Sequence, residues 1–246
     1  SPLLAIGFAL ILLWEELAHL ENTAWLSSCL LLLITAGAVL GSLVFEKRFW
    51  CRYLCPIGGM NGLFAKLSIL ELRAHAGTCS GSCSSYACFK GGPADGEGLA
   101  TAGCPLGTHP AHLSDNRNCV LCLTCVQACP HRSVQLSLRP PAADLRLPLS
   151  VPRGEPLLIL ILFGGLVLHW GRPALEGLPM AQQLLLASIE LALPALVALG
   201  LRRWLGPELW QQGLYGLLPL LLGLLLARHL PVGMGEAGQI FPVSLG

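Results

Sequence analysis

The chain has 246 residues, of which 54% are hydrophobic and 12% are charged, whereas about 25% of the residues of a soluble domain are charged. With a formal net charge of +1 and only 7% aromatic residues, it lacks the basic, aromatic-rich composition of single-strand binders, so no nucleic-acid partner is expected. The hydrophobic residues are concentrated in long runs, which predicts a membrane protein.

Five apolar runs predict five membrane-spanning helices. They cover residues 3–18, 25–45, 156–170, 180–201 and 209–226. A spanning helix needs ~20 apolar residues, so the first run is short. Because the chain begins at Ser1 without an initiator Met, we expect a processed or truncated start, which leaves room for further helices before it.

The segment from 47 to 73 follows the second run and leaves the membrane. Trp50 and Tyr53 have the amphipathic rings that collect at a membrane–water interface. We expect Pro56 and the Gly58–Gly59 pair to break any helix there. The amphipathic stretch 61–72 predicts a helix at the membrane surface.

Residues 74–152 differ in composition from the rest of the chain. They contain eight of the eleven cysteines and no long apolar run. This predicts a small, loop-rich domain outside the membrane, held together by metal rather than by a large core. The expected organisation is a transmembrane hairpin (1–46), a membrane-exit segment with the interfacial helix (47–73), a cluster domain (74–152), C-terminal transmembrane helices (153–231) and a Gly-rich tail (232–246).

The basic residues near the helix ends predict the orientation. On the side that carries the cysteine-rich segment they are Lys47, Arg48, Arg52, Arg146, Arg153, Arg202 and Arg203. The other side has Arg172 and Arg228. Since cytoplasmic loops carry an excess of Lys and Arg, we expect a multi-pass protein of the inner, cytoplasmic membrane with the cysteine domain on the cytoplasmic side.

The strongest motif is CVLCLTCVQACP, which contains Cys119, Cys122, Cys125 and the pair Cys129–Pro130. In bacterial ferredoxins with this spacing, three thiolates bind one [4Fe–4S] cluster and the fourth binds the other cluster. Zinc sites commonly use two well-separated pairs of ligands instead. An odd number of cysteines in a chain that is not a small secreted domain favours metal binding over disulfides.

A second set of cysteines completes the two-cluster pattern. It consists of an irregular triplet and of a cysteine followed by proline, and the expected ligand sets cross between the two halves. Cluster 1 takes Cys79, Cys83, Cys88 and Cys129, and cluster 2 takes Cys104, Cys119, Cys122 and Cys125. The alternative is that some cysteines of the second set are structural thiols.

Cys51 and Cys55 lie where the second run leaves the membrane. Their spacing puts them on one face of a helical turn, so they could share a metal, form a redox-active pair or attack together. Arg52 and Lys47 nearby would favour thiolates. Two buried, unreactive cysteines are the alternative.

Polar residues within the apolar runs are further candidates. Glu190 lies in the middle of the fourth run, where it is either a proton relay or a protonated carboxyl bonded to a neighbouring helix. His19, His169 and His229 fall at run ends on the non-cytoplasmic side. They could bind a haem, a copper ion or a quinone head group, although we favour their interpretation as polar residues that close helices.

Three other histidines, His109, His112 and His131, lie close to the cluster cysteines in the sequence. Ligation of a cluster by histidine is uncommon, and hydrogen bonding to a cluster is the role we favour for them.

The combination of WCRYLCPIGG, a ferredoxin run ending in CVQACP and helices on both sides resembles the membrane-bound polyferredoxins related to NapH, NosR and CcoG. The resemblance covers residues 49–130. It implies two cytoplasmic [4Fe–4S] clusters that pass electrons between a cytoplasmic or quinone pool and a partner across the membrane, or copper redox chemistry for oxidase assembly. The chain differs in having one C-x3-C-P motif and an irregular first triplet.

We therefore expect an all-α polytopic membrane protein with an inserted small α+β ferredoxin-like domain. It would relay electrons through two [4Fe–4S] clusters as a carrier or oxidoreductase subunit rather than a stand-alone enzyme. Its expected partners are the lipid bilayer and either redox proteins or quinone. One alternative is a copper or other metal reductase, or a cofactor-assembly factor, that uses Cys51 and Cys55. Another is a non-redox membrane protein with structural clusters.

Overall fold

The computed structural model describes residues 2–18, 23–45, 50, 54–92, 100–146 and 154–245. Its contacts divide the chain into two compact units. The first unit contains residues 1–7 and 21–152, and the second contains residues 8–20 and 153–246. Most of the first helix therefore groups with the C-terminal helices. The domain boundaries expected from composition, including the hairpin over 1–46, remain predictions.

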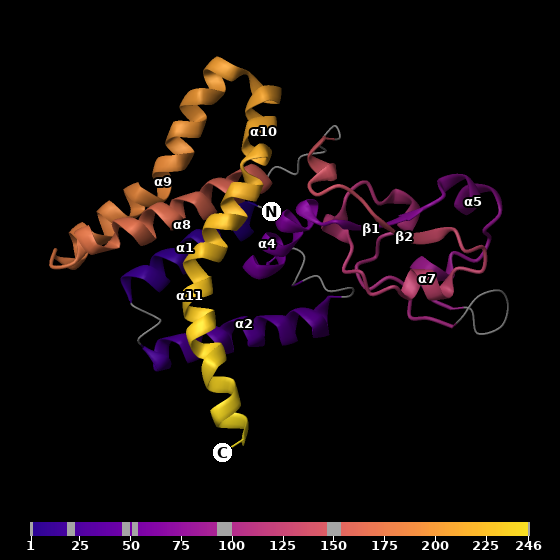
Figure 1. Ribbon diagram of the computed structural model, residues 1–246, viewed down its shortest axis with the longest axis horizontal. Coiled ribbons are helices and arrows are strands. Elements are labelled where there is room, and N and C mark those ends of the chain that lie inside the picture. The colour runs from indigo at the N-terminus through magenta and orange to yellow at the C-terminus, as the bar shows by residue number, and fades with distance from the viewer. Residues whose placement is uncertain are drawn as a thin grey trace. The chain divides into compact units, whose positions relative to one another are not determined.

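The first unit combines one long helix with short helices and a two-stranded sheet (Figure 1). Its elements in chain order are α2 (Ala24–Val44), α4 (Pro56–Phe64), η2 (Ala65–Leu67), β1 (Leu70–Ala74), α5 (Ala76–Gly81), α6 (Ala87–Lys90), η3 (Pro110–His112), η4 (Asn116–Asn118), α7 (Thr124–Ala128), β2 (Val134–Leu138) and η5 (Ala143–Arg146). β1 and β2 pair in antiparallel fashion, with Leu72 opposite Leu136.

Two predictions about residues 56–73 were wrong. Pro56 begins α4, and the two glycines that follow lie inside it, because proline at the first helical position loses no intrahelical hydrogen bond. The helix predicted over 61–72 ends at Phe64, and β1 begins at Leu70. In β1, apolar residues alternate with Glu71 and Arg73, which is the period of a strand with one buried face.

A group of buried charges holds η5 and η4 against β1 in this unit. Asp144, which is 2% exposed, accepts hydrogen bonds from Arg139 and Arg73 and from the backbone N–H of Asn116. Lys66, which is 1% exposed, forms an ion pair with Asp115 at 2.7 Å. Since a buried charge is costly without a partner, these pairs help to determine how the loops around the cysteines are placed.

The second unit is helical within its described residues. It contains most of α1 (Pro2–Leu17), together with α8 (Glu155–Leu175), α9 (Met180–Leu205), α10 (Pro207–Gly216) and α11 (Leu218–Leu245). Leu13 and Leu17 of α1 pack against a core formed by Leu168, Leu175 and Ala187.

α8 and α9 approach closely at Gly164 of α8. A Cβ atom added there would overlap the backbone of Leu191 in α9. Small residues commonly allow such close packing between helices in membranes.

Four of the described helices are long and apolar enough to cross a membrane. They are Ala24–Val44, Glu155–Leu175, Met180–Leu205 and Pro207–Gly235, the last of which joins α10 to part of α11. α1 has 16 residues and is not among them, so the fifth span remains a prediction. α11 continues through the expected tail to Leu245, because extending an existing helix costs less than starting one.

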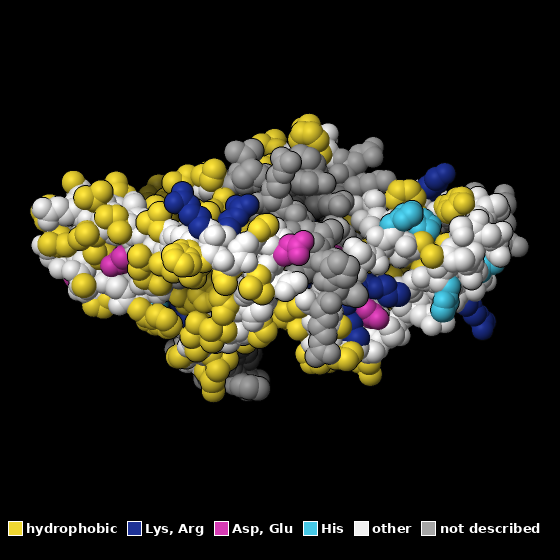
Figure 2. Space-filling view, turned by 90° about the horizontal axis from the view of Figure 1, so that it is seen from above, with side chains coloured by type: hydrophobic (Ala, Val, Ile, Leu, Met, Phe, Trp, Pro, Cys, Tyr) yellow, Lys and Arg dark blue, Asp and Glu magenta, His cyan; other side chains and the backbone are white. Residues whose placement is uncertain are grey.

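The surface agrees with membrane helices. Trp25 and Leu43 of α2 are 74% and 77% exposed, which suits contact with lipid rather than water. In Figure 2, hydrophobic side chains cover much of the visible helical surface, whereas histidine side chains stand out on the part of the first unit that contains the short helices.

Candidate metal centre

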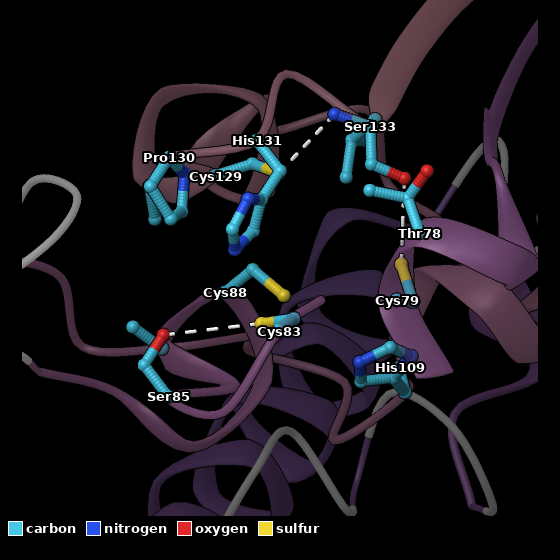
Figure 3. Close-up of a pocket in the computed structure, with 13 residues that line it drawn as sticks. Thr78, Cys79, Cys83, Ser85, Cys88, His109, Cys129, Pro130, His131 and Ser133 are labelled. Atoms are coloured by element: carbon cyan, nitrogen blue, oxygen red, sulfur yellow. Dashed lines mark hydrogen bonds between the residues drawn. The ribbon is translucent and has the colours of Figure 1, made fainter. Parts of the chain in front are cut away.

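Four cysteines line one pocket in the first unit. Cys79 comes from α5, Cys83 from the loop after α5, Cys88 from α6 and Cys129 from the residue after α7. Figure 3 shows their sulfur atoms around one space, with His109 and His131 beside it. The pocket has about 330 Å³ of empty space, part of it open to solvent. We call it the first pocket.

The four other cysteines of the cluster domain line another pocket. Cys104 comes from the segment before η3, Cys119 and Cys122 from the loop before α7, and Cys125 from α7. This second pocket has about 360 Å³ of empty space, part of it open to solvent. The two pockets thus divide the eight cysteines in the same crossed arrangement that the sequence predicted, although ligation itself remains a prediction.

Left-handed backbone conformations shape the loops around these cysteines. Tyr86, Leu121, Leu123 and Arg132 have φ between +48° and +60°, which is uncommon for residues other than glycine and clusters at functional sites. One effect is to turn backbone N–H groups toward sulfur. The N–H of Leu121 donates to the Cys119 sulfur at 3.4 Å, as expected where a loop stabilises a bound anionic group.

The thiols are crowded, and this crowding changes their acidity. Burial and the neighbouring Cys129, Cys83 and Cys79 raise the pKa of Cys88 to about 11. Burial and neighbouring thiols raise the pKa of Cys125 to about 12, and Cys88 is among these neighbours. Without a bound cation, therefore, these side chains favour the neutral thiol. A cationic iron–sulfur core would supply the positive charge that holds them as thiolates.

The arrangement of the thiols suits a [4Fe–4S] cluster. Among the residues that the structure describes, no three His, Cys, Asp or Glu side chains form a group that could hold one metal ion. Four thiols placed around a larger space match a [4Fe–4S] cluster, in which each thiolate binds a different iron. The donor sets of both pockets, which consist of sulfur, also fit iron–sulfur chemistry.

The two pockets are neighbours. α6, which carries Cys88, packs against α7, which carries Cys125. The electrostatic effect of Cys88 on Cys125 reflects the same proximity. A cluster in one pocket would therefore lie close to a cluster in the other.

Other sequence-predicted residues lie elsewhere. Cys55 is buried immediately before α4, while Cys51, its predicted partner, lies outside the described residues. His19 also lies outside them. His169 contacts Glu16 at 3.1 Å, whereas His229 is exposed in α11.

Glu190 is held in the contact between α8 and α9. A Cβ atom at Gly171 would lie 2.6–2.7 Å from its carboxyl group. Its Oε2 atom is buried without a hydrogen-bond partner among the described residues. Its role as a proton relay remains a prediction.

Sequence reasoning missed several residues that organise these sites. Ser133 contacts two cysteines of the first pocket through hydrogen bonds. Its position four residues after Cys129 is the only sequence signal. Glu16 of α1 is 3% exposed and contacts His169, Arg172 and Arg228. Glu16 follows another acidic residue at the end of an apolar run, but its three partners are more than 150 residues away.

Comparison with known proteins gives a match in another part of the chain. Residues 29–72 match the family model described as a 4Fe-4S binding domain. This segment contains Cys29, Cys51 and Cys55 and none of the eight pocket cysteines.

Three curated relatives align with part of the chain. It is 32% identical over 115 residues to YccM of Escherichia coli, whose name provisionally assigns it to electron transport; the match covers 46% of this chain and 28% of YccM. It is 27% identical over 106 residues to an uncharacterized protein of Methanocaldococcus jannaschii, with coverages of 43% and 36%. It is 33% identical over 91 residues to NirI of Paracoccus denitrificans, with coverages of 37% and 11%.

The matched segments therefore span little more than a third of these relatives at most. No solved structure matches the chain. The family match and the relatives together confirm the resemblance expected from the sequence: the chain is similar to membrane-bound 4Fe-4S proteins of the NapH and NosR type and contains a match to a 4Fe-4S binding domain.

Proposed function

We propose that this chain is a membrane-anchored electron-transfer protein that uses two [4Fe–4S] clusters. The supporting observation is the division of eight cysteines between two neighbouring pockets. Cys79, Cys83, Cys88 and Cys129 would hold cluster 1, and Cys104, Cys119, Cys122 and Cys125 would hold cluster 2. In this proposal the residues around them form a small α+β ferredoxin-like domain inserted between membrane helices.

The bound clusters would supply one-electron redox chemistry. The chain would supply the thiolates, exclude part of the solvent and donate hydrogen bonds to sulfur. The packing of α6 against α7 brings the two sets of thiols together, as a relay requires. A lone structural cluster would need no neighbouring partner, so the pairing favours electron transfer over a purely structural role.

The proposed location is the cytoplasmic membrane, with the cluster domain on the cytoplasmic side. The Lys and Arg residues at the helix ends support this orientation; Arg202 and Arg203 in the last turn of α9 are examples among the described residues. Electron donors and acceptors would then be redox proteins or membrane quinone. YccM, whose name associates it with electron transport, is consistent with this class of activity.

Iron analysis and an EPR-monitored redox titration test the proposal on protein purified without oxygen. We expect ~8 Fe per chain and two reversible one-electron transitions. Cys125→Ser should reduce the iron content toward ~4 by removing a ligand of one cluster. Ser137→Ala, which changes an exposed residue of β2 outside both pockets and outside the segment that the family model matches, is the control and should leave the iron content unchanged. A colourless protein loaded with zinc would contradict the proposal.

A second candidate is metal reduction by Cys51 and Cys55, whose spacing would place both thiols on one face of a helical turn. Both residues also fall in the segment that matches the 4Fe-4S binding family. If the double variant Cys51→Ser/Cys55→Ser keeps clusters that donors reduce but no longer reduces copper, metal reductase is the better description. If the double variant loses both cluster reduction and copper reduction, or keeps both, the simple relay is favoured.

A further inference from the structure

The turn between α9 and α10 is short and joins two apolar helical segments. α9 ends at Leu205 and α10 begins at Pro207, so Gly206 alone lies between them. The segments on both sides, Met180–Leu205 and Pro207–Gly235, are long and apolar enough to cross a membrane. A one-residue turn between two spanning helices lies at the membrane surface, because the chain has no length to extend further into water.

Two arginines occupy this turn without a protein anion. Arg202 and Arg203 lie in the last turn of α9 and are exposed. The nearest carboxylate in the sequence is Glu208, and among the residues that the structure describes neither arginine forms an ion pair with it or with any other acidic group. The C-terminal end of a helix offsets only about half a unit of charge, so at least one positive charge is left for a bound anion.

Trp210 restrains one of these arginines. Its side chain is 8% exposed, and its indole N–H donates to the carbonyl oxygen of Ala198 at 2.6 Å. The guanidinium carbon of Arg202 lies over this ring, 5.4 Å from its centroid. A cation–π contact fixes the guanidinium without pairing its charge with an anion. Its N–H groups can therefore still donate to the oxygens of a phosphate.

Apolar side chains surround the arginines and are open to the surroundings. Trp204 is 90% exposed, and Leu205 and Leu209 are 45% and 55% exposed. Figure 2 is seen from the side of this turn, and it shows basic side chains set among hydrophobic ones on the helical part. Exposed tryptophan rings lie at the level of lipid head groups. The turn thus combines cations for an anionic head group with apolar side chains for acyl chains.

We infer that the α9–α10 turn is a binding site for an anionic phospholipid. The lipid phosphate lies at Arg202 and Arg203, and the acyl chains pack beside Trp204 and Leu209. A phospholipid fits better than a small inorganic anion, because only an amphiphile uses the exposed apolar side chains as well as the charges. This site goes beyond the proposed electron transfer and does not depend on the clusters. Under the proposed orientation it faces the cytoplasmic leaflet.

Native mass spectrometry tests the site on the whole chain with its clusters loaded. The protein is placed in nanodiscs that contain equal amounts of phosphatidylglycerol and phosphatidylcholine, and the lipids that stay bound after release are counted. We expect the unmodified protein to retain phosphatidylglycerol in preference to phosphatidylcholine. Arg202→Gln/Arg203→Gln should reduce this preference by about fivefold for each arginine removed.

Two further variants separate the local site from net charge and from folding. Lys90→Gln/Arg132→Gln removes two positive charges at exposed positions of the first unit and should leave the lipid preference unchanged. Arg202→Lys/Arg203→Lys keeps both charges at the turn and should retain most of the preference. A circular dichroism spectrum of each variant checks that the helices remain folded.

Four results would overturn the inference. They are equal retention of the two lipids by the unmodified protein, an unchanged preference in Arg202→Gln/Arg203→Gln, an equal loss in Lys90→Gln/Arg132→Gln, and an equal loss in the lysine variant. Displacement of phosphatidylglycerol by inorganic phosphate would also overturn it, by showing a site for small anions. Iron content and cluster reduction are measured separately, so failure of the lipid site leaves the proposed relay unaffected.

Discussion

At the scale of single residues, the cysteine pockets depend on charges that do not touch the cysteines. The Asp144 carboxylate in η5 accepts hydrogen bonds from the side chains of Arg139 and Arg73 and from the backbone N–H of Asn116. Asn116 begins η4, which ends one residue before Cys119. A buried carboxylate thus links the C-terminal end of this region to the start of the ferredoxin run, so its loss should loosen the loop that carries two predicted ligands.

We predict that Asp144→Ala lowers the free energy of unfolding of the β1–β2 region by about 3–5 kcal/mol, because Arg139 is left buried without its main partner. Hydrogen exchange of the β1 and β2 amides in the full-length protein measures this change. Glu71→Ala is the control. Glu71 contacts the same two arginines at 3.3 Å but is 24% exposed, so its loss should cost only about 0–1 kcal/mol.

The effect of Asp144→Ala should not depend on pH near neutrality. The hydrogen bond to Asp144 raises the pKa of Arg139 above its ordinary value. A group whose pKa is raised on folding stabilises the folded state at every pH below its unfolded value. The loss measured at about pH 6 and at about pH 9 should therefore be the same, and a strong pH dependence would contradict this assignment.

At the scale of helices, a buried carboxylate joins three elements of the second unit. Glu16 of α1 lies 2.5 Å from Arg228 of α11, 3.1 Å from His169 of α8 and 3.5 Å from Arg172 of α8. A pocket next to it is lined by Leu17, Leu168, Leu175, Glu176 and Gln183. The interaction explains how polar residues in three apolar helices can be accommodated together.

We predict that Glu16→Ala destabilises the second unit by about 3–5 kcal/mol, because two arginines lose a buried partner. Thermal unfolding in detergent measures the change. The neighbouring Glu15→Ala is a matched control, since Glu15 contacts Arg228 at 3.4 Å but its side chain is 40% exposed. Its expected cost is roughly 0–1 kcal/mol. Equal losses for the two variants would show that burial of Glu16 is not the decisive factor.

Gly171 provides a test of the contact between α8 and α9. We predict that Gly171→Ala destabilises the second unit by about 1–3 kcal/mol, because the new methyl group would meet the Glu190 carboxyl at 2.6–2.7 Å. In the double variant with Glu190→Ala, much of this cost should disappear. Gly200→Ala in α9, where a Cβ atom meets nothing within 4 Å, is the control. Additive effects of the two substitutions would contradict the contact.

At the scale of the whole molecule, two kinds of stabilisation are combined. The helices of the second unit pack through leucine and small residues. The short helices and the two-stranded sheet around the cysteine pockets have few large, fully buried side chains, such as Leu72. A small region with so little core usually depends on metal or disulfides for its stability. No disulfide joins the cysteines of this region that the structure describes.

We therefore predict that cluster removal unfolds the cysteine region while sparing the membrane helices. Hydrogen exchange, compared between the loaded protein and protein treated anaerobically with an iron chelator, should show a large loss of protection in β1, β2 and α7. α8 and α9 should change little, because the second unit has its own core. Unchanged protection of β1 and β2 after complete iron loss would contradict a structural role for the clusters.

The sequence alone determined which chemistry the chain can perform. Thiolate spacing is local and chemically specific, so CVLCLTCVQACP indicates iron–sulfur binding in any fold that presents it. Long apolar runs likewise predict membrane helices, because a bilayer imposes a minimum length. Together with WCRYLCPIGG, these features carry the resemblance to membrane 4Fe-4S proteins, which the family match at 29–72 and the relatives confirm.

Only the tertiary structure decided which distant residues meet. Residues 70–72 are a strand rather than part of a helix because β2 pairs with them across more than 60 residues of chain. Ser133 lies beside Cys79, and Glu16 lies beside Arg228, through contacts between distant segments. Local propensity and spacing contain no information about such pairs, because the free energy of a long-range contact depends on how the whole chain packs.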